Sequence, residues 1–188
     1  MLVYAHSIND VNNILKKDSN LLRKWINEIF LDKSSKNLRR KNQDMILTKV
    51  FTKNIHNNTY YATVYGCKKG LLINIFLLVS LGNKQKIYLI NGIRSYVLFT
   101  FEQHFINRFL ERTRNTHCNL LIALTREFNG FPIFAHSLIF LKDGRWMYKS
   151  RNGYAIMDKN IFITFITDLS NKQQELYDSC VQKDLSRF

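Results

Sequence analysis

Residues 59–99 read TYYATVYGCKKGLLINIFLLVSLGNKQKIYLINGIRSYVLF, and short strand-like runs alternate there with turn signals. The runs at 59–65, 71–81, 86–90 and 96–99 are rich in β-branched, aromatic and other apolar residues. Gly66, Gly70, the Gly82-Asn83 pair and the Asn91-Gly92 pair separate these runs at hairpin spacing. The pattern predicts a meander of antiparallel strands.

C-terminal to this meander, the sequence predicts a helix pair, more strands and a last helix. The first helix covers 100–113, with Thr100 as N-cap and Gln103 completing a capping box. The second covers 117–128 and ends before Asn129 and Gly130. Strands follow at 133–141, 145–150, 154–157 and 161–166, and the last helix begins at Ser170. We predict an α+β fold in which antiparallel sheets of hairpins pack against the helix pair.

Residues 1–58 are expected to be helical and irregular. Asp18, Ser19 and Asn20 offer an N-cap for a helix whose apolar positions continue to Phe30. The following residues 32–44 are polar and basic. We therefore divide the chain into a basic N-terminal segment, 1–58, and an α+β domain, 59–188.

The chain carries 28 Lys and Arg residues against 14 Asp and Glu residues, a formal charge of +14. Basic surfaces attract polyanions, because bound Lys and Arg release the counterions condensed on phosphate backbones. The charge favours a nucleic-acid partner, RNA before DNA. An anionic protein or membrane surface, or the codon bias of an AT-rich genome, are the alternatives.

The sequence gives no reason to expect a membrane span, a metal or a cofactor. No apolar run reaches the roughly 18 residues of a transmembrane helix, and the N-terminus lacks the pattern of a secretory signal. The three cysteines, Cys67, Cys118 and Cys180, are far apart and suit a reducing cytoplasm. Phosphate-loop, dinucleotide, metalloprotease and nucleophile-elbow motifs are absent. We expect a cytoplasmic protein without a cofactor.

The helix predicted at 100–113 carries the candidate chemistry. At 100° per residue, the phenylalanines fall on one strip and His104, Arg108 and Arg112 on a parallel strip beside it. An imidazole can transfer a proton near neutral pH, and guanidinium groups bind phosphate oxygens. A ribonuclease that uses no metal needs these parts. The alternative is a solvated helix face, with Glu111 paired to a neighbouring arginine.

The run Gln103–Arg112, QHFINRFLER, followed by a second helix and a hairpin-rich sheet, resembles small ribonuclease domains of phages and mobile elements. These are the RelE-like toxins and the barnase–EndoU–colicin relatives. The resemblance covers about residues 100–168 and implies that His104 is the helix histidine, that Arg108 and Arg112 are the basic positions, and that Thr167 is the polar residue late in the sheet. The meander at 59–99 is not part of the plan of those toxins.

Other residues could complete a catalytic site or a nucleic-acid surface. His136 and Tyr148 are candidate supporting groups for catalysis. An aromatic and cationic hairpin near 145–151 suits base stacking and phosphate contact, or is simply a half-buried edge hairpin. The predicted nucleic-acid contacts are Lys33, Lys36, Arg39, Arg40, Arg114, Arg126, Lys149 and Arg151.

The leading hypothesis from the sequence is a basic nucleic-acid-interacting protein that cuts RNA without a metal. The alternatives are a non-catalytic phage accessory or inhibitor that docks on a host or phage protein, and a virion or assembly component. The sequence leaves the oligomeric state open.

Overall fold

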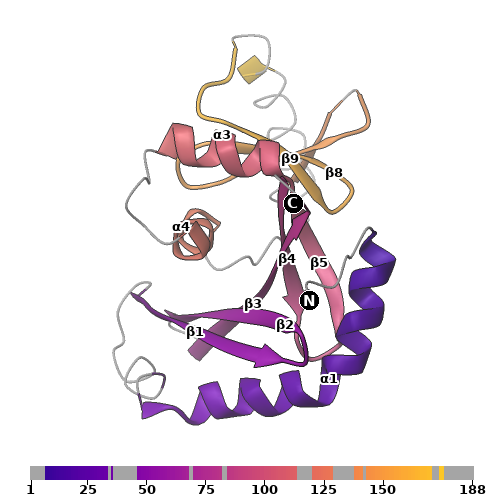
Figure 1. The fold of residues 1–188 in the computed structure, drawn as a ribbon. Coiled ribbons are helices and arrows are strands. Elements are labelled where there is room, and N and C mark those ends of the chain that lie inside the picture. The colour runs from indigo at the N-terminus through magenta and orange to yellow at the C-terminus, as the bar shows by residue number, and fades with distance from the viewer. Residues whose placement is uncertain are drawn as a thin grey trace, which may run out of the picture.

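The computed structural model describes residues 7–33, 35, 46–67, 70–81, 84–113, 120–128, 138–141, 143–170 and 174–175. Three helices and nine strands lie in these ranges (Figure 1). In chain order they are α1 (Ile8–Leu31), β1 (Ile46–Ile55), β2 (Asn58–Cys67), β3 (Gly70–Leu81), β4 (Lys84–Asn91), β5 (Tyr96–Phe101), α3 (Gln103–Thr113), α4 (Leu120–Glu127), β6 (Leu138–Phe140), β7 (Trp146–Lys149), β8 (Tyr154–Asp158) and β9 (Ile161–Ile166).

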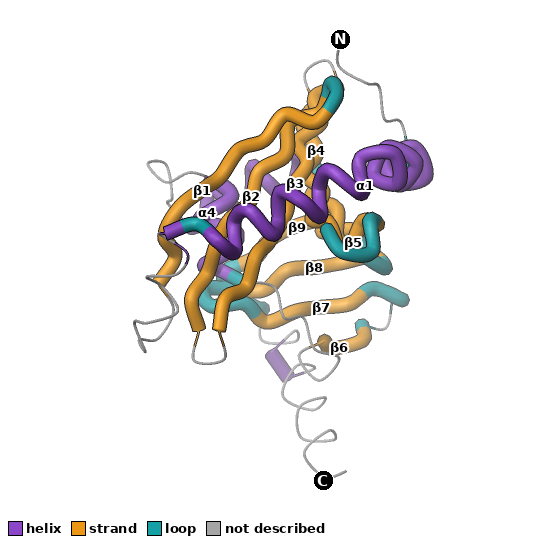
Figure 2. The backbone as a smooth tube through the Cα atoms, turned by 90° about the horizontal axis from the view of Figure 1, so that it is seen from below, coloured by secondary structure: helices purple, strands orange, loops and turns teal. Residues whose placement is uncertain are grey.

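All nine strands belong to one sheet, in the order β1-β2-β3-β4-β5-β9-β8-β7-β6 (Figure 2). Each half of the sheet is an antiparallel series of hairpins. The halves join where β5 pairs with β9 in parallel. The prediction of an α+β fold with mostly antiparallel strands is confirmed. The predicted packing against a helix pair is matched only loosely, because α1 packs on the sheet as well as α3 and α4.

The helices cover opposite faces of the curved sheet. Alternate residues of β3 separate into two cores, with Ile75 and Leu77 packed in the core beneath α1 and Phe76 in the core beneath α3 and α4. Figure 2 shows α1 running across β1 to β5, and Figure 1 shows α3 and α4 beyond the other face. A third, smaller cluster forms around Ile139 and Met147.

The predicted N-cap at Asp18 is wrong. The helix begins ten residues earlier, where Ser7 and Asp10 form a capping box with each other. Asp18 lies within α1 and is only 2% exposed. Its carboxylate accepts hydrogen bonds from His56 Nδ1 at 2.7 Å, Asn58 Nδ2 at 3.0 Å and the Tyr60 hydroxyl at 2.6 Å. Asp18, which the sequence presents as a helix cap, therefore anchors α1 to the β1–β2 hairpin.

The prediction that residues 1–58 are helical and irregular misses strand β1. This ten-residue strand pairs with β2 from Ile46 to Ile55 through a two-residue turn in which His56 has φ 50°. Its exposed Lys49, Thr52 and Lys53 interrupt the apolar pattern that would have identified it.

The predicted cap of the next helix is also wrong. Thr100 is buried in β5, and the helix begins at Gln103. The Gln103 side chain instead accepts a hydrogen bond from the backbone N–H of Gln85 at 2.6 Å, which ties α3 to the start of β4. The strand predicted at 161–166 is confirmed, whereas the last helix lies mostly outside the described residues. No described helix has the length and apolarity that a membrane span requires.

Replacing Asp18 with alanine is expected to lower the free energy of unfolding by about 3 kcal/mol, because three polar groups of the hairpin lose their acceptor. Urea denaturation followed by circular dichroism measures this. Asp158→Ala removes an exposed carboxylate and is the matched control, expected within about 0.5 kcal/mol of wild type. Equal stability of both variants would contradict the anchoring role.

Stability is expected to fall in alkali because two buried tyrosines resist ionisation. Burial, with Glu102 and Asp10 nearby, raises the pKa of Tyr88 to about 12, and burial beside Asp18 raises the pKa of Tyr60. The unfolded phenols ionise near 10.0. The stabilisation is thus complete below that pH and is lost as the pH rises towards the folded pKa.

The measurement is the free energy of unfolding from about pH 8 to pH 11. Tyr88→Phe is expected to make the alkaline decline shallower, while Tyr96→Phe, at an exposed site, leaves it unchanged. An identical decline in both variants would contradict the assignment.

Candidate nucleic-acid interface

One face of α1 presents only cations and amides to solvent. We call this the α1 stripe, and its exposed members are Asn13, Lys16, Lys17, Asn20, Arg23, Lys24 and Asn27. Their spacing follows successive helical turns, opposite the buried face that includes Leu15, Leu22 and Ile29. Because an α-helix rises about 1.5 Å per residue, the stripe extends for roughly 21 Å.

The carboxylates of α1 do not interrupt this stripe. Asp10 closes the N-terminal capping box, and Asp18 is buried against the β1–β2 hairpin. Glu28 follows the last member and lies 3.4 Å from Lys53 Nζ on β1. The stripe therefore keeps an unbroken positive charge along its length.

The three polar residues predicted on α3 have different surroundings. His104 is exposed. Arg108 forms a 3.0 Å ion pair with Glu111 one turn further along. The Arg112 guanidinium donates to the backbone carbonyl of Phe165 on β9. Two of the three groups thus bind within the protein, and the described residues do not bring an imidazole and two available guanidinium groups to a common hollow.

The buried residues predicted beside them behave as expected. Phe105 and Phe109 are fully buried and stack with their centroids 6.0 Å apart. Phe109 also meets Phe165 edge-to-face at 5.3 Å. The polar strip of α3 therefore lies at the margin of a packed aromatic core.

The β7–β8 hairpin is organised by a buried carboxylate. Glu127, at the end of α4, accepts hydrogen bonds from Ser150 Oγ at 2.6 Å and Asn152 Nδ2 at 2.7 Å. Tyr148 is buried and stacks on Phe128 with centroids 5.6 Å apart, and burial together with Glu127 raises its pKa. The Tyr148 ring thus belongs to the core, where it is not available to stack on a base.

The remaining predicted residues that the structure describes fall into separate groups. Lys149, Arg151 and Arg126 are exposed around the hairpin and the end of α4, and Lys33 is exposed beyond α1. Thr167 Oγ1 donates to the neighbouring Asp168 at 3.1 Å. Five further predicted residues lie outside the described residues, and these are Lys36, Arg39, Arg40, Arg114 and His136.

Sequence reasoning missed the α1 stripe, although its signal is present. Lysine and arginine occur at 16, 17, 23 and 24, with asparagine at 13, 20 and 27. The predicted helix start at Asp18 cuts this pattern in two, and its helical period is lost.

Within the described ranges, no three His, Cys, Asp or Glu side chains gather closely enough to hold a metal ion. Comparisons of the chain with family models, with curated proteins and with solved structures found no match. The interface is therefore argued from its own residues.

The two arginines of α3 are expected to differ in structural importance. Arg112→Met should lower the free energy of unfolding by about 1–2 kcal/mol, because the Phe165 carbonyl loses a charged donor. Arg108→Met keeps the aliphatic stem and removes only a surface ion pair, so a change below about 0.5 kcal/mol is expected. Parallel urea titrations measure both, and a larger loss for Arg108→Met would show that Arg112 is not the structural arginine of α3.

Proposed function

We propose that the protein binds nucleic acid through the phosphate backbone and that the α1 stripe is its contact surface. The supporting observation is a helix face about 21 Å long with four exposed cations and no carboxylate among its members. Lysine and arginine bind phosphate oxygens, and the amides of Asn13, Asn20 and Asn27 add hydrogen-bond donors between them.

Contacts of this kind are largely independent of base sequence. Neutralised phosphates release counterions, so the affinity falls steeply as salt rises. Because RNA and DNA share the phosphate backbone, both are candidate ligands. RNA remains the favoured one of the two, as in the hypothesis from the sequence. Segments of the chain outside the described residues add further lysines and arginines to the overall charge.

Cleavage of RNA is the sharper form of the hypothesis and depends on His104. The described geometry supports binding better, because Arg108 and Arg112 already bind Glu111 and the Phe165 carbonyl. Docking on a protein is the second candidate function, favoured by an apolar cavity on another part of the molecule.

Neutralising the stripe is expected to weaken binding and flatten its salt dependence. The variant is Lys16→Gln, Lys17→Gln and Lys24→Gln together, since glutamine keeps helix propensity while removing charge. Fluorescence anisotropy with a labelled single-stranded RNA and a duplex DNA, across about 50 to 200 mM salt, measures the slope of log K against log salt. Each lost phosphate contact should reduce it by about 0.7 to 0.9.

The matched control is Arg126→Gln, Lys149→Gln and Arg151→Gln, which removes the same charge from the α4 and hairpin surface. It is expected to keep most of the affinity and the slope. Equal losses of affinity in both variants would mean that the overall charge of the protein, and not the α1 stripe, determines binding. On a denaturing gel we expect intact RNA, whereas metal-independent cleavage that His104→Ala abolishes would assign catalysis to α3.

A further inference from the structure

Within the part of the chain that the structure describes, the N-terminal end of β3 has one unpaired edge. On one side, β3 pairs with β2 as far as Gly70. On the other side, β4 pairs with β3 only from Leu81 to Ile75 before the chain turns towards β5. Among the described residues, no strand pairs with residues 70–74 on the β4 side. An unpaired edge presents backbone donors and acceptors that can bind another strand.

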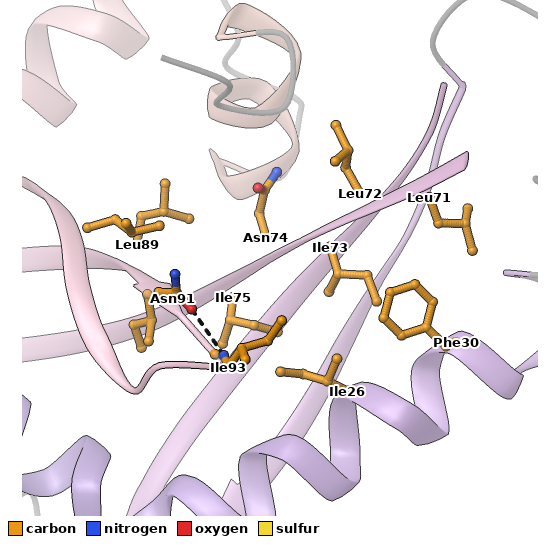
Figure 3. A pocket seen from close by; sticks show the side chains of 13 residues that line it. Ile26, Phe30, Leu71, Leu72, Ile73, Asn74, Ile75, Leu89, Asn91 and Ile93 are labelled. Atoms are coloured by element: carbon orange, nitrogen blue, oxygen red, sulfur yellow. Dashed lines mark hydrogen bonds between the residues drawn. The ribbon is translucent and has the colours of Figure 1, made fainter. Parts of the chain in front are cut away.

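A cavity of about 280 Å³ lies along this edge (Figure 3). Ile73 and Ile75 point to the side where Ile26 and Phe30 of α1 form the wall. Asn74 points to the opposite side of β3, as does Leu72. A cavity bounded from both faces of the sheet has the form of a missing strand, because successive side chains of a strand point to opposite faces.

A buried amide makes the site more than an apolar hollow. Asn74 is 8% exposed, and its Nδ2 atom has no hydrogen-bond partner. A buried amide donor without a partner is costly, and an incoming carbonyl oxygen would satisfy it.

The β4–β5 turn holds an apolar side chain beside this cavity. Asn91 Oδ1 accepts from the backbone N–H of Ile93 at 3.2 Å and of Arg94 at 2.9 Å. Arg23 Nε donates to the Ile93 carbonyl at 3.0 Å. This fixed turn leaves Ile93 69% exposed, and Leu72 on the edge is 38% exposed. Both residues line the cavity and offer apolar contact to a ligand.

We propose that an extended segment of another protein adds as a strand to residues 70–74 of β3 and fills this cavity. Its main chain pairs with the free edge, and its apolar side chains alternate between the α1 side and the Asn74 side. This inference concerns a surface other than the α1 stripe and does not depend on nucleic-acid binding.

Charge around the cavity selects acidic flanks on the partner segment. Arg94 follows Ile93 directly, and Arg23 bonds to its carbonyl. Lys33 lies three residues beyond Phe30 and is exposed. Of the nearby carboxylates, Asp32 directly precedes Lys33 and is half-buried, and Glu28 is paired with Lys53. A strand with an apolar centre and carboxylates at both ends complements these cations, since exposed opposite charges steer and orient association. The chain's own basic stretch at 36–41 has the opposite character.

The probe is a synthetic peptide, EEVIVLVEE, with blocked ends. Hydrogen exchange of the backbone amides at 71–74 is followed with and without the peptide, and anisotropy of a labelled copy gives the dissociation constant. We expect the edge amides that do not bond to β2 to become protected. Ile93→Asp should weaken binding about tenfold or more, because an acidic group enters the apolar contact beside acidic flanks.

Matched controls separate this site from other modes of binding. Phe140→Asp places the same charge at a 58% exposed apolar residue on β6, the outer strand at the other end of the sheet, and should leave the affinity unchanged. The peptide N-methylated at alternate residues and its lysine-flanked version, KKVIVLVKK, should both bind poorly. The triple glutamine variant of the α1 stripe keeps Arg23, Arg94 and Lys33 and should retain most of the peptide affinity.

Several results would overturn the proposal. Edge amides that are already protected in the dilute free protein would mean that the chain covers its own edge. Protection that grows with protein concentration alone would identify a second copy as the occupant. Absence of peptide binding, binding that survives N-methylation, or binding lost in Phe140→Asp but kept in Ile93→Asp would exclude strand addition at β3.

Discussion

The two antiparallel halves of the sheet meet at two residue pairs, Thr100 with Ile161 and Phe101 with Phe162, and the rest of the fold depends on this junction. Parallel strands need a long connection, which here contains α3, α4 and the second set of hairpins. So short a ladder contributes few hydrogen bonds. Side-chain packing also stabilises the junction. The rings of Phe101 and Phe162 stack with their centroids 4.6 Å apart, and the ring centroid of Phe105 on α3 lies 5.2 Å from that of Phe162.

This junction explains why the cations of α3 and α1 differ in availability. α3 lies directly over β9, so Arg112 reaches the Phe165 carbonyl and helps to hold the helix in place. α1 lies on the opposite face and is fixed through the carboxylate of Asp18, buried beneath the helix. Of its outward cations, Arg23 donates to the Ile93 carbonyl, whereas the exposed Lys16, Lys17 and Lys24 belong to the α1 stripe. Each helix thus has one arginine that donates to a backbone carbonyl, Arg23 on α1 and Arg112 on α3.

The sequence predicts the parts of the fold that are encoded by neighbours along the chain. β9 is predicted with its observed bounds because a short run of β-branched and aromatic residues defines it locally, and α3 is predicted to within its first turn. The start of α1 is not, because Asp18 has the character of a cap but its acceptor atoms serve His56, 38 residues away. The contact of Arg112 is missed for the same reason: helical spacing places Arg112 on a strip of α3, but only tertiary packing brings it to the Phe165 carbonyl.

Arg23 links the two proposed binding surfaces, since it belongs to the α1 stripe and its Nε donates to the Ile93 carbonyl beside the β3 edge. A polyanion on the stripe would lower the positive potential that attracts acidic flanks to the cavity, because exposed charges act over a Debye length of about 8 Å at physiological salt. Under the two proposals together, binding at one surface would weaken binding at the other, and linkage would make the effect reciprocal.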